Sequence, residues 1–254
     1  MEWRREHEID TLLDWFEEPE VMRRYFPSGF VGHDKDGFPL LVERIGNIDF
    51  PGMYRAVGEA TFLRWVALYH ERQELLLRKA TQTAGELRDK MSVIIDLNGL
   101  SIGMAQSATL NVLRKRTTLE ERIYPEVVRT VFLINAPMLF SGVWQIVQYF
   151  VDEGTRVKMN IYSSASATKA ALTDRVEIPE LPAFLGGELR QPEGDDECSA
   201  LIGHGGLVHP GYFVGPDPRC ARLVLPAGGA VTARFVMAPG AVLRARHAAT
   251  KNEI

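Results

Sequence analysis

The distribution of apolar residues predicts alternating strands and helices over about the first 175 residues. Two short runs rich in β-branched side chains, 92–97 and 131–134, are apolar on both faces, as central strands of a parallel sheet are. Apolar residues recur every three or four positions over 59–87, 104–124 and 141–151, which predicts helices with one buried face. The pattern therefore indicates an α/β fold.

The segment from Ile123 to Ser163 contains one complete strand–helix–strand unit. A strand over 131–134 is followed by a helix and then by a second strand over 157–162. The helix carries an apolar stripe that we expect to face inward, formed by Val143, Ile146, Val147, Phe150 and Val151. Parallel strands need such a crossover, so the unit predicts a largely parallel sheet.

The two ends of the chain differ from this central part. Residues 1–28 predict an N-terminal helical segment, with Ile9, Leu12, Leu13 and Phe16 at helical spacing. A turn over 32–37 opens a strand over 38–45, and a loop is expected over 46–58. After an acidic linker at 190–198, short β-branched runs alternate with Pro-Gly turns. Residues 199–254 therefore predict a small β-rich appendage.

Composition and charge narrow the class of protein. With 46% hydrophobic and 24% charged residues, the chain has ordinary values for a soluble globular protein. A net charge of −4 argues against a nucleic-acid partner. The compact basic cluster Arg114-Lys115-Arg116 is either a solvated helix face or a contact for anionic lipid headgroups.

The apolar segments and the cysteines bear on where the protein works. The N-terminal region has no apolar segment typical of a signal peptide, and no apolar run approaches the roughly 18 residues that span a bilayer. We therefore expect a cytoplasmic protein with free thiols at Cys198 and Cys220, associating only transiently with membranes.

A serine-hydrolase motif is the strongest sign of an enzyme. Gly99 to Gly103 fits G-x-S-x-G between a strand and a helix, and histidines follow it. However, the Gly203–Gly206 loop, which resembles an oxyanion loop, lies after Ser101 instead of before it, and Asp96-Leu97-Asn98 separates the strand from the turn. Ser101 then serves as the N-cap of the helix at 104–124.

Metal and nucleotide sites find little support in the sequence. The six histidines are scattered, with neither an HExxH motif nor paired CxxC motifs. No P-loop and no GxGxxG motif follows a strand. We therefore expect neither a cofactor nor a metal.

Several ordered motifs resemble one family of lipid-binding proteins. They are Tyr124-Pro125-Glu126, INAP at 134–137, FSGVW at 140–144, TRVKMNI at 155–161, IIDLNGLS at 94–101 and LPAFLGGEL at 181–189. Together they resemble the CRAL-TRIO lipid-binding and transfer family over roughly residues 29–188. The beginning and the tail are most similar to the supernatant-protein-factor and tocopherol-associated branch, which carries a C-terminal GOLD β-sandwich.

The resemblance implies a domain organisation and a fold. It implies a CRAL-TRIO domain over 29–189, with a mixed, largely parallel sheet, flanking helices and a lipid pocket closed by a helical lid at about 141–158. Family members usually begin with a longer helical segment than the one seen here. Residues 199–254 would form a partial GOLD-like region, whose strands are a candidate surface for a protein partner.

The resemblance also implies residues that bind a lipid headgroup. Glu126, Thr155 and Lys158 stand at positions used by members that take phosphatidylinositol. Lys158 offers a point charge to a phosphate, Thr155 a hydroxyl and Glu126 an acceptor for inositol hydroxyls. Without the resemblance, a solvated glutamate near Arg129 and a surface lysine are the plain interpretation.

The expected function is non-enzymatic binding of a hydrophobic ligand and its transfer between membranes. Phosphatidylinositol or another phospholipid is the first candidate ligand. Where phosphatidylcholine-binding members place hydroxyls, this chain has Met91, Val93 and Ile95. A tocopherol, squalene or retinoid carrier is therefore the first alternative, and a hydrolase using Ser101 is the second.

Overall fold

The computed structural model describes residues 2–101, 106–191 and 194–213, which belong to one compact unit ending at Val214. The strands are β1 (Ser28–His33), β2 (Pro39–Glu43), β3 (Met91–Asp96), β4 (Val128–Ile134) and β5 (Met159–Ile161). The α-helices are α1 (Glu2–Glu6), α2 (Leu12–Trp15), α3 (Glu20–Tyr25), α4 (Phe50–Val57), α5 (Glu59–Ala84), α6 (Ser107–Ile123), α7 (Phe140–Val147), α8 (Glu153–Arg156), α9 (Ala165–Arg175) and α10 (Ser199–Ile202). Short 3₁₀ turns are η1 (Ile9–Thr11), η2 (Ile45–Asn47), η4 (Gln148–Phe150), η5 (Ile178–Glu180), η6 (Ala183–Leu185) and η8 (Pro210–Tyr212).

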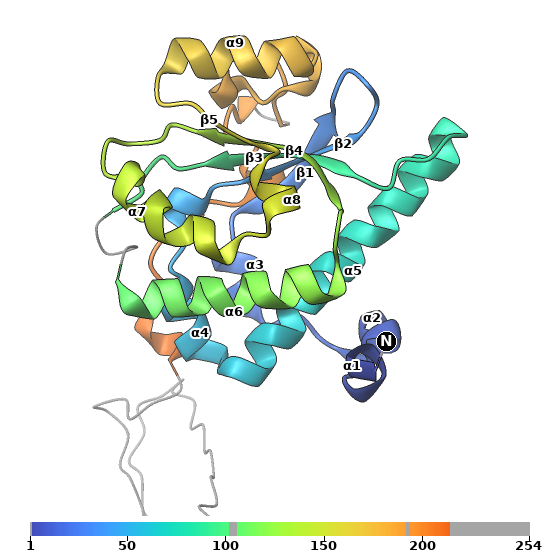
Figure 1. Cartoon of the computed structure of the whole chain (residues 1–254), viewed down its shortest axis with the longest axis vertical. Helices are drawn as coiled ribbons and strands as arrows, with labels where there is room; N and C mark the ends of the chain where they lie inside the picture. Colours follow the sequence, from blue (N-terminus) through green and yellow to red (C-terminus); the bar gives the residue numbers. More distant parts are fainter. Residues whose placement is uncertain (1, 102–105, 192–193, 214–254) are drawn as a thin grey trace, which may run out of the picture. The chain divides into compact units, whose positions relative to one another are not determined.

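The sheet follows the order of the chain, β1-β2-β3-β4-β5. β1 and β2 form an antiparallel hairpin, and β2, β3, β4 and β5 run parallel. Helical crossovers connect the parallel strands: α4 and α5, then α6, then α7 and α8 (Figure 1). This confirms the predicted α/β fold with a mixed, largely parallel sheet.

Strict alternation along the central strands buries both faces of the sheet. Leu40, Val42, Ile94, Phe132 and Ile134 face α9 and the chain that follows it, including Leu172 and Leu181. Their neighbours Leu41, Val93, Val131 and Leu133 face the opposite layer, which contains α5, α6 and α7 (Figure 1). Successive side chains of a strand point to opposite faces of the sheet. Because both faces are buried here, these strands appear in the sequence as continuous apolar runs.

A second core lies among the helices below the sheet. Phe62, Trp65 and Val66 of α5 are buried against Phe50 and Met53 of α4. The N-terminal segment joins this core through Ile9 and Leu12, whereas Leu13 is exposed. That segment is broken into α1, η1 and α2, so the expected single helix becomes three short turns.

Several elements differ from the sequence expectation. The chain over 46–58 was expected to be a loop, yet it contains α4. The first turn of α4 holds Pro51, and the Asp49 carboxylate caps the helix by accepting a hydrogen bond from Gly52 N. α6 begins at Ser107 with Gln106 as its N-cap, so Ser101 does not cap it. The strand β1 was not expected at all.

The start of the C-terminal region packs on the main body. α10 lies against β1, and Ile202 and Cys198 are buried in the core on that side of the sheet. Gly206 forms an isolated bridge with Ile48. The strand-like runs at 222–225, 231–236 and 242–244, and Cys220, lie outside the described residues, so the GOLD-like appendage stays a prediction.

Asp34 connects the β1–β2 hairpin to the centre of the sheet. Its Oδ1 accepts hydrogen bonds from Asp36 N at 3.1 Å and Phe38 N at 3.0 Å. Its Oδ2 accepts from Ser92 Oγ at 2.6 Å and from Arg129 Nη1 at 2.7 Å. The buried carboxylate thus joins the turn to β3 and β4.

We predict that Asp34→Ala lowers the free energy of unfolding by about 2–4 kcal/mol, because it leaves Ser92 buried without its acceptor and frees the turn. Urea unfolding followed by circular dichroism measures the change. Asp36→Ala is the matched control, since that exposed carboxylate contacts only the outer edge of Arg129. Equal effects of the two substitutions would contradict the role given to Asp34.

Candidate functional site

An apolar cavity of about 270 Å³ lies between the sheet and the helices α5, α6 and α7. Its floor is the lower face of the central strands. Floor residues are Leu41, Met91, Val93, Ile95, Val131, Leu133 and Met159. Met91, Val93 and Ile95, which stand where the resemblance places the hydroxyls of phosphatidylcholine-binding members, therefore form part of the floor. These seven side chains offer hydrocarbon contact to a guest, and Glu43 at the end of β2 adds a carboxylate to the lining.

The helix α7 covers one side of the cavity, where the sequence predicted a lid. Of the predicted apolar stripe, Val143, Val147 and Val151 line the cavity, whereas Ile146 and Phe150 do not. Ile146 is 44% exposed. The regular helix ends at Val147 and continues as the 3₁₀ turn η4, which has three residues per turn and changes the direction of later side chains. Phe140 and Trp144 complete this wall.

The region around α7 also has apolar side chains that point to solvent. Met138, Tyr149 and Val157 are strongly exposed, and they lie just before α7, in η4 and just after α8. Exposed apolar groups gathered at the cover of a cavity are typical of a surface that contacts something apolar.

The structure brings two of the predicted headgroup residues into contact. Lys158 Nζ lies 3.2 Å from Glu126 Oε2. Glu126 lines the cavity although its side chain is 68% exposed, which places it at the mouth. Glu126 has a left-handed backbone with φ of 64°, an uncommon conformation for a residue other than glycine. Arg129 is engaged elsewhere, with Asp34 and Asp36.

Thr155 lines the cavity beside this pair. It belongs to α8, whose N-cap residue Asp152 accepts a hydrogen bond from Thr155 N at 2.9 Å. Burial acts to raise the pKa of Asp152, but hydrogen bonds from Thr155 and Gly154 outweigh it, so that pKa is lowered overall. Thr155 is thus held by α8 at the cavity, next to an ionised carboxylate.

A buried charged network, which the sequence reasoning missed, forms another part of the cavity wall. Arg116 Nη2 donates to Glu43 Oε1 at 3.0 Å, and Arg116 Nε donates to Glu120 Oε1 at 2.6 Å. His70 Nε2 lies 3.0 Å from Glu120 Oε1, and Tyr69 Oη donates to Glu43 Oε1 at 2.8 Å. The network joins α6 to α5 and β2.

The charges in this network hold one another ionised. Burial acts to raise the pKa of Glu120, but the charge of Arg116 and the hydrogen bond from His70 lower it to about 2. Burial acts to lower the pKa of Arg116, but Glu120 and Glu43 raise it overall. Burial, helped by the charge of Glu43, raises the pKa of Tyr69 well above its ordinary value.

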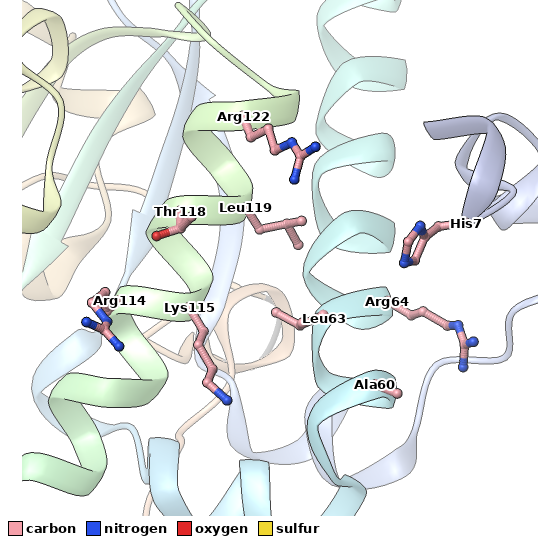
Figure 2. A pocket seen from close by; sticks show the side chains of 9 residues that line it. All are labelled: His7, Ala60, Leu63, Arg64, Arg114, Lys115, Thr118, Leu119 and Arg122. Atoms are coloured by element: carbon pink, nitrogen blue, oxygen red, sulfur yellow. The ribbon is translucent and has the colours of Figure 1, made fainter. Parts of the chain in front are cut away.

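A second cavity, of about 540 Å³, lies between α5 and α6 on the other side of α6. Figure 2 shows Ala60, Leu63 and Arg64 reaching it from α5, His7 from the N-terminal segment, and five side chains from α6. Those from α6 are Arg114, Lys115, Thr118, Leu119 and Arg122. The basic cluster Arg114-Lys115-Arg116 is therefore divided between the two cavities, since Arg114 and Lys115 line this second cavity and Arg116 lines the apolar one.

The hydrolase alternative gains no support from the described residues. Within residues 2–101, 106–191 and 194–213, no hydrogen bond joins Ser101 to a histidine. His204 Nδ1 lies 4.0 Å from Glu197 Oε2, and His209 Nδ1 accepts from Gly211 N at 3.0 Å. His247 lies outside the described residues. A serine–histidine pair is therefore not assembled in this part of the chain.

Two further searches covered the described part of the chain. No group of three or more histidine, cysteine, aspartate or glutamate side chains there could hold a metal ion. No helix there is both long and apolar enough to cross a bilayer. Cys198 is a buried free thiol, and burial raises its pKa.

An apolar cavity between a largely parallel sheet and a covering helix is the kind of site in which proteins bind hydrophobic ligands. A family model described as the CRAL/TRIO domain matches residues 23–187, more than half of the chain. The chain belongs to the CRAL/TRIO family. The family and the cavity together support the binding of a lipid-like ligand.

The similar proteins are consistent with this assignment. Proteins named Protein real-time from Aedes aegypti and Drosophila melanogaster are 32% and 34% identical over 210 and 212 residues. These matches cover 82% of this chain but only 31% and 30% of the relatives, so the chain spans less than a third of their length. The predicted likeness to the supernatant-protein-factor branch and its GOLD region is not tested by them.

One solved structure supports the fold. The crystal structure of Sfh5 superposes with a TM-score of 0.56 at 21% identity, covering 82% of this chain and 68% of that chain. At this identity the likeness concerns the fold alone.

The buried network predicts a pH-dependent stability. The pKa of Glu120 is lowered from 4.5 to about 2, so its contribution is fully present above pH 4.5 and is lost as the pH falls through about 2. We expect up to about 3 kcal/mol to disappear over this window. Urea unfolding at pH 6, 4.5, 3 and 2 measures it.

Glu120→Gln provides the matched comparison, because it keeps the shape and removes the ionisation. In this variant the loss of stability between pH 4.5 and 2 should be smaller by about the contribution of Glu120. Parallel stability curves for the two proteins would show that Glu120 does not supply this pH dependence.

Proposed function

We propose that the protein binds a phospholipid, with phosphatidylinositol as the first candidate, and moves it between membranes without catalysing a reaction. The observation that carries the proposal is the Glu126–Lys158 pair, of which Glu126 lines the apolar cavity. A cavity of this kind suits acyl chains, and a cation beside it suits a phosphate. The motif resemblance at Glu126, Thr155 and Lys158 points to the same ligand.

In the empty protein Lys158 has Glu126 as its partner. When a lipid arrives, its phosphate takes Lys158 as a partner, and Glu126 becomes free to accept hydrogen bonds from inositol hydroxyls. Thr155, held at the cavity by α8, adds a hydroxyl. Glu126 then exchanges its ion pair for hydrogen bonds to hydroxyls, and because its side chain is 68% exposed, its charge stays solvated.

The volume of the cavity indicates that α7 moves when a lipid enters. About 270 Å³ lies below the roughly 300–1,000 Å³ of most ligand pockets, and it is too small for two long acyl chains. Outward movement of α7 would enlarge the space. The exposed Met138, Tyr149 and Val157 would then contact the acyl region of a bilayer, where each buried methylene contributes about 0.8 kcal/mol.

A neutral hydrophobic guest such as a tocopherol or retinoid is the second candidate. The apolar floor formed by Met91, Val93 and Ile95 favours it, since such a guest needs no charged partner. The same carrier function would then use the cavity without Lys158.

We predict that Lys158→Ala lowers phosphatidylinositol transfer between vesicles about tenfold, because a lysine–phosphate contact in a partly buried site is lost. A fluorescence assay with labelled phosphatidylinositol measures the rate. Lys79→Ala is the matched control, because it removes an exposed lysine of α5 that is far from Lys158 in the sequence. Uptake of retinol by Lys158→Ala should stay close to that of the unmodified protein.

Two outcomes would change the assignment. If both ligands are affected equally, Lys158 supports the lid instead of binding the headgroup. If neither is affected, the ligand is not an inositol lipid and the neutral guest takes its place.

A further inference from the structure

The second cavity, here called the basic groove, is lined by cations and by no carboxylate among the described residues. Its volume of about 540 Å³ falls within the roughly 300–1,000 Å³ of most ligand pockets. Arg64 lines it from α5, and Arg114, Lys115 and Arg122 line it from α6. The chain as a whole carries a net charge of −4, so this positive charge does not follow from a basic composition.

Three of these cations lack an ion-pair partner. Lys115 is neutralised, because its Nζ lies 2.6 Å from Glu59 Oε2. Arg64, Arg114 and Arg122 form no ion pair with any residue that the structure describes. All three are exposed, so a ligand in water can reach them. Like charges that line one cavity repel one another, and a bound anion would relieve that repulsion.

The spacing of the arginines indicates an anion with more than one charged group. Arg114, Thr118 and Arg122 follow one another at intervals of four residues, which places them on one face of α6. The outer two are separated by about 12 Å along the helix axis. A guanidinium group matches two oxygens of a phosphate. An elongated ligand with several phosphate groups therefore suits this face better than a single phosphate does.

The apolar part of the groove is recessed between the helices. Figure 2 shows Leu63 and Leu119 pointing toward one another from α5 and α6, with Arg122 at one end of this space and Lys115 at the other. Leu119 is buried and Leu63 is half-buried, so neither can enter a bilayer. Membrane-binding helices combine basic residues with apolar side chains that do enter it. The groove therefore suits a ligand that is dissolved in water.

We propose that the basic groove binds a water-soluble small molecule carrying several phosphate groups, held by Arg64, Arg114 and Arg122. Thr118 adds a hydroxyl on the same face of α6. The site is separate from the apolar cavity, and the proposal does not rest on lipid binding.

The first test uses inorganic tripolyphosphate as the probe, with calorimetric titration of the full chain at about 0.15 M salt, where weak surface attraction is screened. Binding should saturate at one site. Arg114→Gln and Arg122→Gln should each weaken it about fivefold, because a charge-assisted hydrogen bond is lost. Arg23→Gln is the matched control, since it removes an exposed arginine of α3 that does not line the groove.

A second variant should strengthen binding, which a folding defect would not do. Glu59→Gln removes the carboxylate that neutralises Lys115, so the groove gains one more unpaired cation. The affinity for tripolyphosphate should rise about threefold or more. An unchanged or lower affinity in this variant would contradict the placement of the ligand beside Lys115.

Further outcomes would overturn the proposal. These are no saturable binding of tripolyphosphate, or an equal loss in Arg23→Gln. Citrate binding as tightly as tripolyphosphate would show that charge alone is recognised and not phosphate. If vesicles containing phosphatidylinositol bisphosphate displace tripolyphosphate and lose affinity in Arg122→Gln, the phosphates belong to a membrane and not to a soluble ligand.

The transfer assay separates this site from the proposed carrier function. Arg114→Gln and Arg122→Gln should transfer labelled phosphatidylinositol at the rate of the unmodified protein, because neither residue lines the apolar cavity. Failure of transfer in the unmodified protein would overturn the carrier function and leave the basic groove unaffected. Loss of transfer together with tripolyphosphate binding in both variants would show that the two arginines support the fold, and would overturn the separate site.

Discussion

The buried guanidinium of Arg116 determines how α6 lies against the sheet. It is bonded to Glu43 on β2 and to Glu120 on its own helix, and it lies 5.2 Å from the Phe26 ring and 5.9 Å from the Tyr69 ring. A buried charge that loses a partner costs several kcal/mol, so α6 cannot shift toward the sheet as an apolar helix would. The space that remains between α6 and the strands is the apolar cavity.

The central sheet could be predicted because its signal is local. The runs at β3 and β4 are apolar on both faces, and each strand is followed by a helix with one apolar face. β1 and α4 lacked such a signal, because glycines interrupt the strand and Phe50-Pro51-Gly52 is typical of a loop. α4 forms because the Asp49 side chain caps it and its apolar residues join the helical core.

The candidate site was only partly predictable for a different reason. The Glu126–Lys158 contact came from a family pattern, and no periodicity relates residues 32 positions apart. From the sequence, Arg116 was interpreted as one member of a surface cluster. Its buried network could not be predicted because Glu43 lies 73 residues from Arg116 and His70 lies 50 residues from Glu120. Ile146 and Phe150 fit a regular helical stripe, but Ile146 lies on an exposed side of α7 and Phe150 falls in the 3₁₀ turn that follows it.

The two polar regions of the cavity differ in burial, and burial sets what each contributes. Glu126 is 68% exposed at the mouth and its partner Lys158 is 22% exposed, so solvent screens this pair in part and its contribution to any headgroup binding would be modest. The Arg116 network in the wall is shielded from water, so an unpaired group there would keep its full desolvation cost. If the protein is the carrier proposed above, exchange with a bilayer would take place at the partly solvated mouth, and the guest would contact the buried wall formed by α5 and α6 in transit.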